Sequence, residues 1–230
     1  MRDLVQRGFL NLMKCDFTYR HYQECIELAK SKSYEFYRLC DYASLTSDSK
    51  KSIFMRHDVD HCLDLALNMA ELERDLGVNS TYYVRMHSKN YNVLSLQSTK
   101  KLRSIIAMGH EVGLHYEPSY AEIMNIDKLK FLKSDLSALE NCLSYKVVGV
   151  SPHEPTREGT FKIEESLLSQ VGLKYQAYDD IFFKNMKYIS DSSCNWREGC
   201  MHEFIESETD RLCILTHPFW WYQQSSLENY

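Results

Sequence analysis

Several features that would mark large classes of protein are missing from this sequence. Its 230 residues show no composition shift sharp enough to mark a linker, and no apolar run approaches the length of a membrane span. Positive charge is not in excess: the formal net charge is −5 and is spread along the chain, which argues against a nucleic-acid surface. We therefore expect one domain over residues 1–230 that acts on a small molecule or a polysaccharide.

Paired cysteine motifs are also missing. The eight cysteines show no CxxC pair and no tight framework spacing, which favours reduced thiols over a disulfide scaffold. The amino-terminal residues 1–7 are not followed by an apolar core of signal-peptide length. These absences predict a soluble, cytoplasmic protein.

The most informative stretch that is present covers residues 52–61, an apolar run that ends in two acids flanked by histidines. Its β-branched and aromatic residues predict a buried strand, and alternation places Asp58 and Asp60 on the same side. Two carboxylates at one strand end are costly to bury unless a metal, a cation or a proton compensates them. The strand end is a candidate active site, although a helix cap combined with an ion pair would give the same pattern.

Strands and helices alternate along the rest of the chain. Strands are also predicted at residues 34–39, 81–86, 111–115, 146–150, 174–178, 187–190 and 211–218, and helices at residues 19–32, 61–76, 98–108, 125–145 and 163–171. Gly77, Gly109 and Gly172 stand where left-handed caps would end three of these helices. This alternation predicts an α/β fold of parallel βαβ units, with enough strands to close a barrel.

In parallel α/β barrels the active site lies at the carboxyl ends of the strands. Six polar residues fall at or just beyond such predicted ends: Asp58, Asp60, His115, His153, Asp191 and His217. An Asp and a His would bind a divalent metal, a second Asp would take a proton from water, and a further His would protonate a leaving amine. This set is typical of metal-assisted hydrolysis of an amide or ester, while each histidine alone also fits a structural role.

The remaining histidines are weaker candidates for the chemistry. His21, on a predicted surface helix, and His87, in a polar loop, are predicted to be solvated. His57 alternates with Asp58, so it is predicted to face the helical layer in a hydrogen-bonded structural role. His110 is predicted to point away from His115, and His61 either caps the next helix or reaches the site.

Four ordered motifs resemble the polysaccharide deacetylase superfamily, the NodB-homology or carbohydrate esterase family 4-like group. They are RHDVD at residues 56–60, GHEVGLH at 109–115, YISD at 188–191 with WREG at 196–199, and LTHPFWW at 215–221. They look most like the branch found in surface-polysaccharide and O-antigen biosynthesis, over about residues 17–221. The resemblance implies a distorted (β/α) barrel of about seven parallel strands and a divalent metal, most often zinc. It also implies removal of an acyl group from an amino sugar.

Carried over by position, the resemblance implies that Asp58 is the catalytic base and His217 the catalytic acid. It implies that Asp60 and His115 bind the metal. Asp191 falls where the family places the residue that orients the acid.

The predicted substrate contacts are mostly aromatic. Trp196 falls where the family walls the acetyl pocket, and Tyr116 and Trp220 are expected to stack on sugar rings. For Trp220, packing onto the barrel is an equally good interpretation. Arg56 and Glu117 complete the set expected to face the substrate.

One departure from the family pattern concerns the metal. The usual second metal histidine lies four residues after the first, and here that position is Ser119, a poor ligand. Glu117 or His153 would replace it, and we favour His153 because nitrogen suits zinc.

The second departure is Glu154, in the stretch where the family offers an arginine that holds the base. Arg157 or Arg56 would substitute for it. Without either, Asp58 would lose its partner.

Three functions follow from these observations. The first is a cytoplasmic metal-dependent deacetylase acting on an N-acetylated sugar, nucleotide- or lipid-linked, during surface-glycan synthesis. The second is an inactive relative that binds a glycan or a biosynthetic partner at the same mouth. The third is hydrolysis of another non-peptide carbon–nitrogen bond.

Overall fold

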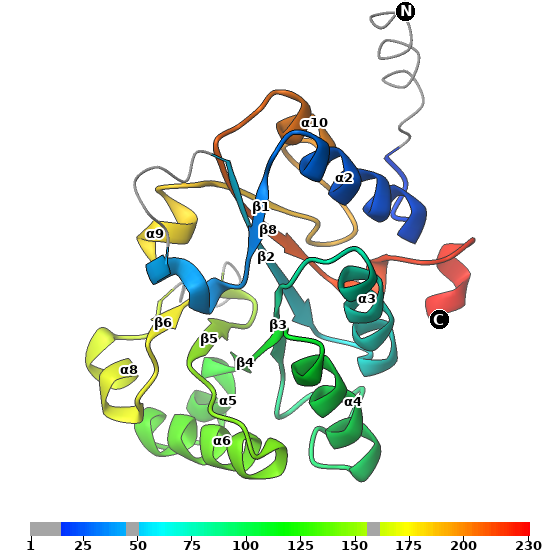
Figure 1. The fold of residues 1–230 in the computed structure, drawn as a ribbon. Helices are drawn as coiled ribbons and strands as arrows, with labels where there is room; N and C mark the ends of the chain where they lie inside the picture. The colour runs from blue at the N-terminus through cyan, green and yellow to red at the C-terminus, as the bar shows by residue number, and fades with distance from the viewer. Residues whose placement is uncertain (1–14, 45–50, 156–161) are drawn as a thin grey trace, which may run out of the picture.

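The computed structural model describes residues 15–44, 51–155 and 162–230, and it contains one curled sheet of eight parallel strands. The strand order is β6-β5-β4-β3-β2-β8-β7, with β1 paired to β2 outside this path. The strands are β1 (Glu35–Tyr37), β2 (Ser52–Val59), β3 (Thr81–Val84), β4 (Glu111–Tyr116), β5 (Gly149–Pro152), β6 (Tyr175–Gln176), β7 (Lys187–Ser190) and β8 (Arg211–Thr216). Figure 1 shows the strands at the centre with helices around them, which confirms the distorted (β/α) barrel.

The helices alternate with the strands along most of the chain. They are α2 (Tyr19–Ser31), α3 (Leu63–Asp75), α4 (Leu96–Ala107), α5 (Pro118–Ile123), α6 (Lys128–Leu143), α8 (Glu165–Val171), α9 (Asp180–Phe183) and α10 (Met201–Glu206). The described residues also form three 3-10 helices, η1 (Leu39–Ser44), η2 (Pro218–Trp220) and η3 (Ser226–Asn229). The short helices α5, α9 and α10 were not predicted, because four to six residues are too few to show a helical period. None of the helices within the described ranges combines the length and apolar character needed to cross a membrane.

Local signals in the sequence set several helix ends. Thr18 accepts a hydrogen bond from the backbone of His21 at the start of α2, as an N-cap does. Gly77, Gly109 and Gly172 have positive φ angles of 67°, 96° and 76° and follow α3, α4 and α8. The predicted left-handed helix ends are therefore confirmed.

The inner face of the curled sheet is filled by large aromatic side chains. A Cβ atom on Gly113 would lie 2.5 Å from the ring of Tyr83, and one on Gly149 would lie 2.2 Å from the ring of Tyr175. Both tyrosines are fully or nearly fully buried. Glycine at these two strand positions is therefore what allows tyrosine to fill the barrel beneath the strand ends.

The outer face of β2 is joined to α3 by a buried polar network. His57 Nε2 lies 2.9 Å from a carboxylate oxygen of Glu73 on α3, and His57 Nδ1 lies 2.6 Å from Thr216 Oγ1. Tyr22 and Tyr82 also donate to Glu73, at 2.6 and 2.7 Å. Burial by itself would raise the pKa of Glu73, but His57 outweighs it and lowers that pKa to about 2. The predicted structural role of His57 is confirmed.

Candidate active site

A cavity of about 880 Å³ opens where the carboxyl ends of the strands meet. Five of the six polar residues predicted at strand ends line it, together with a tryptophan: Asp58, Asp60, His115, His153, His217 and Trp220. The sixth, Asp191, is fully buried behind His217. Sheet order brings these residues together, because β2 lies between β3 and β8 and β4 lies beside β5.

Three of these side chains form a group that fits a metal ion. One ligand atom from each of Asp60, His115 and His153 lies within 4.8 Å of the other two. The Nδ1 atom of His115 is 2.8 Å from the carbonyl oxygen of Ser151 on β5, so it donates there and leaves Nε2 facing Asp60. This hydrogen bond fixes the ring in the orientation that a metal ligand needs.

The distances within the group suit a divalent ion. Asp60 Oδ1 lies 3.5 Å from His115 Nε2 and 3.6 Å from His153 Nε2, and it is buried without a hydrogen-bond partner in the described part of the chain. Oxygen and nitrogen ligands at about 2.0–2.1 Å from a tetrahedral zinc ion would be about 3.4 Å apart. Burial, with the positive charge of Arg85, lowers the pKa of His153 to about 3, so its ring is neutral as a ligand must be.

Asp58 lies beside this group and is held by an arginine. The Asp58 carboxylate is 4% exposed, and one oxygen lies 3.5 Å from Arg56 Nη2 and 3.6 Å from His115 Nε2. Burial acts to raise the pKa of Asp58, but the charge of Arg56, with that of protonated His217, outweighs it, so the pKa is lowered. An ionised carboxylate next to the candidate metal position is equipped to accept a proton from water.

Arg56 itself is not a substrate contact, which corrects the sequence-based prediction. It is fully buried because β2 points it inward with Asp58, and Nη2 donates to the hydroxyl of Tyr178 at 2.9 Å. Its guanidinium also lies 4.5 Å from the ring centre of Tyr178 and 5.8 Å from that of Tyr188. Arg56 thus stands beside the Asp58 carboxylate as its positive partner, whereas Arg157 lies outside the described residues.

His217 is held by Asp191 on the other side of the cavity. Its Nδ1 lies 2.6 Å from Asp191 Oδ1, its backbone N–H donates to Asp191 Oδ2 at 3.0 Å, and Trp221 Nε1 donates to the same oxygen at 3.0 Å. Burial would lower the pKa of His217, but Asp191 outweighs it and raises that pKa to about 9. A protonated His217 therefore presents Nε2 toward the cavity as a proton donor.

Glu117 and Tyr116 lie apart from the chemistry, contrary to the prediction that they face the substrate. Glu117 is 8% exposed and forms a salt bridge with Arg85. Arg85 in turn lies 3.9 Å from Asp60. Tyr116 points away from its neighbour His115 and packs in the outer core. Strand alternation explains the second error, because adjacent residues of β4 face opposite sides of the sheet.

The aromatic side chains at the mouth divide into two sets. Trp220 lines the cavity and also packs against the core. Trp196 is not part of the lining and stacks on Phe17, with ring centres 6.4 Å apart, so the predicted acetyl-pocket wall is not seen there. His61 reaches the cavity and packs against Phe219, which settles the choice between a cap and the site.

Sequence reasoning missed three residues that support this site. Tyr178 and Tyr188 enclose Arg56, and Arg85 joins Asp60 to Glu117. Their only signal in the sequence was a position in or at the end of a predicted strand. Their partners come from other strands, so nothing local identified them.

Comparisons with known proteins identify solved structures that share this fold. No family model matches the chain, and no curated protein matches it. A carbohydrate esterase family 4 enzyme from Streptococcus mutans superposes with a TM-score of 0.53 at 14% identity, over 82% of each chain. A second match is a pseudoenzyme of the same family from Bacillus anthracis, in the form of a mutant whose enzymatic activity was restored. It gives a TM-score of 0.51 at 12% identity. That match covers 75% of this chain and 58% of the other. The chain thus shares the fold of the carbohydrate esterase family 4, or NodB-like, polysaccharide deacetylases.

Proposed function

We propose that this protein is a metal-dependent hydrolase that removes the N-acetyl group of an amino sugar. The observation that carries this proposal is the set of side chains around one cavity. Asp58 lies 3.6 Å from His115 of the metal group, and His217 Nε2 lies 3.9 Å from Asp60 of the same group. A base, an acid and a metal group within reach of one bound amide are what hydrolysis requires.

Each protein group has a defined task in this reaction. Asp58 takes a proton from the attacking water, whose oxygen forms the new bond to the acyl carbon. His217 then gives its Nε2 proton to the sugar nitrogen as the carbon–nitrogen bond breaks, so that acetate and a free amine result. Asp60, His115 and His153 would hold the divalent ion, which would supply Lewis acidity for the acyl oxygen when bound. Arg56 and Asp191 keep the base ionised and the acid protonated.

The substrate class follows from the motifs and from the mouth of the cavity. The four motifs resemble those of surface-polysaccharide biosynthesis proteins, and Trp220 offers a face on which a sugar ring stacks. We therefore propose an N-acetylated sugar, linked to a nucleotide or a lipid and processed in the cytoplasm, with zinc as the metal.

The test combines metal analysis with substrate profiling. Purified protein is reconstituted with zinc and assayed for acetate release from N-acetylglucosamine oligomers and from nucleotide- and lipid-linked N-acetyl sugars. Acetate release that is lost in His115→Ala and in His153→Ala, together with about one metal ion, supports the proposal. Full turnover in either variant contradicts the metal assignment.

A second candidate, a glycan-binding protein without turnover, is favoured by two specific residues. Ser119 occupies the usual place of the second metal histidine but lies in α5 and not in the cavity lining. Glu154 lines the cavity with a positive φ of 45°, where the family offers an arginine. Saturable binding of an intact N-acetyl sugar, with no acetate released after metal reconstitution, would select this candidate.

A further inference from the structure

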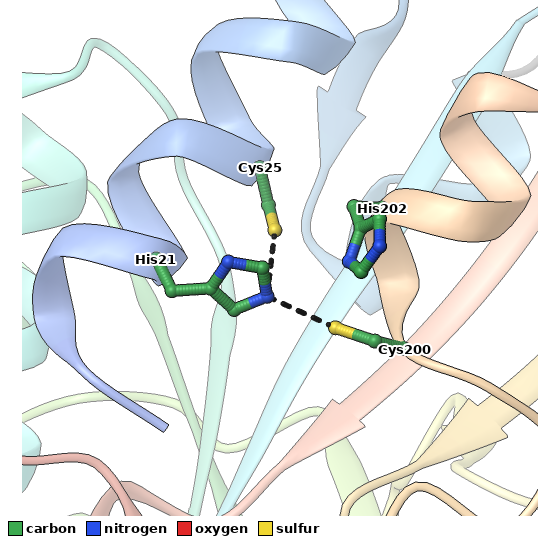
Figure 2. A group of neighbouring side chains, drawn as sticks. All are labelled: His21, Cys25, Cys200 and His202. Carbon is green, nitrogen blue, oxygen red and sulfur yellow. Dashed lines mark hydrogen bonds between the residues drawn. The ribbon is translucent and has the colours of Figure 1, made fainter. Parts of the chain in front are cut away.

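A second cluster of metal-binding side chains lies away from the cavity, between α2 and α10 (Figure 2). His21 and Cys25 are one turn apart on α2, so they project from the same face of that helix. Cys200 is the N-cap of α10 and His202 lies in its first turn. One ligand atom from each of the four residues lies within 4.8 Å of the others.

Three of the four side chains are buried and His202 is half-buried, which corrects the prediction that His21 is solvated. His21 and Cys200 are each 2% exposed and Cys25 is fully buried, because α10 packs over the face of α2 that carries them. The surrounding side chains are apolar or aromatic, among them Tyr22 and Trp221. In such surroundings a polar group needs a partner to offset its lost hydration.

The cluster has fewer hydrogen bonds than its polar atoms require. His21 Nε2 lies 3.2 Å from Cys200 Sγ and 3.6 Å from Cys25 Sγ (Figure 2). A thiol is a weak hydrogen-bonding group, so these contacts replace little of the lost hydration. Within the described part of the chain, Nδ1 of both His21 and His202 is buried without a hydrogen-bond partner.

The donor set and its spacing match a tetrahedral zinc ion. Two cysteines and two histidines form one of the standard closed sets for structural zinc. With zinc–sulfur and zinc–nitrogen bonds of about 2.3 and 2.0–2.1 Å, tetrahedral geometry places sulfur and nitrogen about 3.6 Å apart. The two distances of 3.2 and 3.6 Å fall near this value. Two thiolates balance the charge of the ion, so the bound site is neutral and suits its buried place.

We propose that His21, Cys25, Cys200 and His202 bind a structural zinc ion that joins α2 to α10. The two helices are far apart in sequence, since His21 and Cys200 are separated by 179 positions. A bond between such distant segments restricts the unfolded chain strongly, as other long-range crosslinks do. The proposal does not depend on the deacetylase function, because the four ligands lie outside the catalytic cavity.

The position of the cluster also links it to the catalytic acid. The rings of His21 and Trp221 are nearly parallel, with centres 6.5 Å apart. Trp221 donates to Asp191, which holds His217. Ordering of α2 and α10 by zinc therefore supports the position of Trp221 behind the active site.

Cobalt substitution tests the proposal, because a thiolate bound to Co²⁺ gives a near-ultraviolet charge-transfer band. The Asp60, His115 and His153 group contains no sulfur, so it cannot give this band. Full-length protein reconstituted with Co²⁺ under reducing conditions is expected to show it, and added zinc is expected to abolish it. Wild-type protein without the band would overturn the proposal, whatever the activity of the enzyme.

Variants assign the ligands. Cys25→Ser and Cys200→Ser are expected to lose most of the band and about one zinc ion per chain. Cys142→Ser is the matched control, because its half-buried thiol lies on α6 and contacts Thr99 instead. His115→Ala is expected to keep the band. Retention of the full band in Cys200→Ser would overturn the assignment.

Two further measurements keep the test decisive. The exposed Cys15 thiol lies near Cys200 and His21, so Cys15→Ser must retain the band, and its loss there would overturn the four-residue ligand set. If Cys25→Ser and Cys200→Ser fail to fold, thiol labelling of wild-type protein replaces them. Zinc is expected to slow labelling of Cys25 and Cys200 at least tenfold relative to a chelator, and equal rates would contradict the proposal.

Discussion

The two clusters of metal-binding side chains differ in their donors and in their access to solvent. Asp60, His115 and His153 offer oxygen and nitrogen, and they open into a large cavity. The second cluster offers two sulfurs and two nitrogens and is closed by two helices. Catalytic zinc sites keep a position open for water and substrate, whereas structural sites fill all four positions with protein ligands.

The surroundings of the two clusters differ in the same direction. The group formed by Asp60, His115 and His153, here called the open group, has a carboxylate on one side and a protonatable imidazole on the other. These are the side chains of Asp58 and His217. The second cluster, here called the closed cluster, consists of His21, Cys25, Cys200 and His202. It is packed against apolar side chains and Trp221. The comparison teaches that only one of the two is equipped to move protons, although both have the composition of a metal site.

The largest expected effect is the loss of turnover when the carboxylate beside the open group is removed and both metals stay bound. Asp58→Asn removes the base, so kcat should fall by about 10³-fold, within the range for a general base. Asp64→Asn, on the exposed start of α3, is the control and should keep full activity. Acetate release and metal content are measured together, and unchanged turnover in Asp58→Asn would remove it from the mechanism.

Zinc should stabilise the closed cluster independently of the open group. At a free zinc concentration 100-fold above Kd, a single site adds about 2.7 kcal/mol of stability. For a chain of this size that corresponds to roughly 5–10 °C in Tm. We expect this shift in His115→Ala, measured by thermal unfolding, because that variant retains the closed cluster. A similar zinc response in Cys200→Ser would instead place the stabilising ion at the open group.

The pH profile distinguishes the open group from an inert metal site. His217 must be protonated to act as the acid, and its pKa of about 9 predicts that kcat falls as the pH rises through that value. Asp191→Asn removes the charge that raises this pKa, so the falling limb should move down toward 6.5. At pH 8 the protonated fraction, and with it kcat, would then fall roughly 30-fold. An unmoved limb would show that another group controls the profile.

The smallest expected effect tests the connection between the two clusters. Trp221→Phe removes the indole donor to Asp191 and keeps an aromatic ring next to His21. We expect kcat to fall roughly tenfold, or about 1.4 kcal/mol, as for loss of one hydrogen bond to a charged group. The cobalt charge-transfer band should be unchanged. Loss of the band in this variant would mean that Trp221 supports the closed cluster itself.

The sequence by itself determined the local elements and the direction of several site residues. Alternation along β2 placed Asp58 on the inner face and His57 on the helical face, and the structure has both there. The glycines at 77, 109 and 172 marked three helix ends, because only glycine adopts a positive φ at little cost. The expected barrel and the strand-end position of the site followed from the alternation of strands and helices.

Only the tertiary structure decided which side chains meet. His153 rather than Glu117 completes the group with Asp60, because Arg85, the residue after β3, forms a salt bridge with Glu117. Burial of Arg56 depends on tyrosines that come from distant parts of the chain.

The closed cluster shows most clearly that the sequence alone did not predict contacts between distant segments. The local pattern around His21 predicted an exposed helix face, yet α10 covers it and brings Cys200 to that face across most of the chain length. The physical reason is that spacing along a chain sets the period of a helix or a strand, whereas contacts between distant segments depend on sheet order and packing.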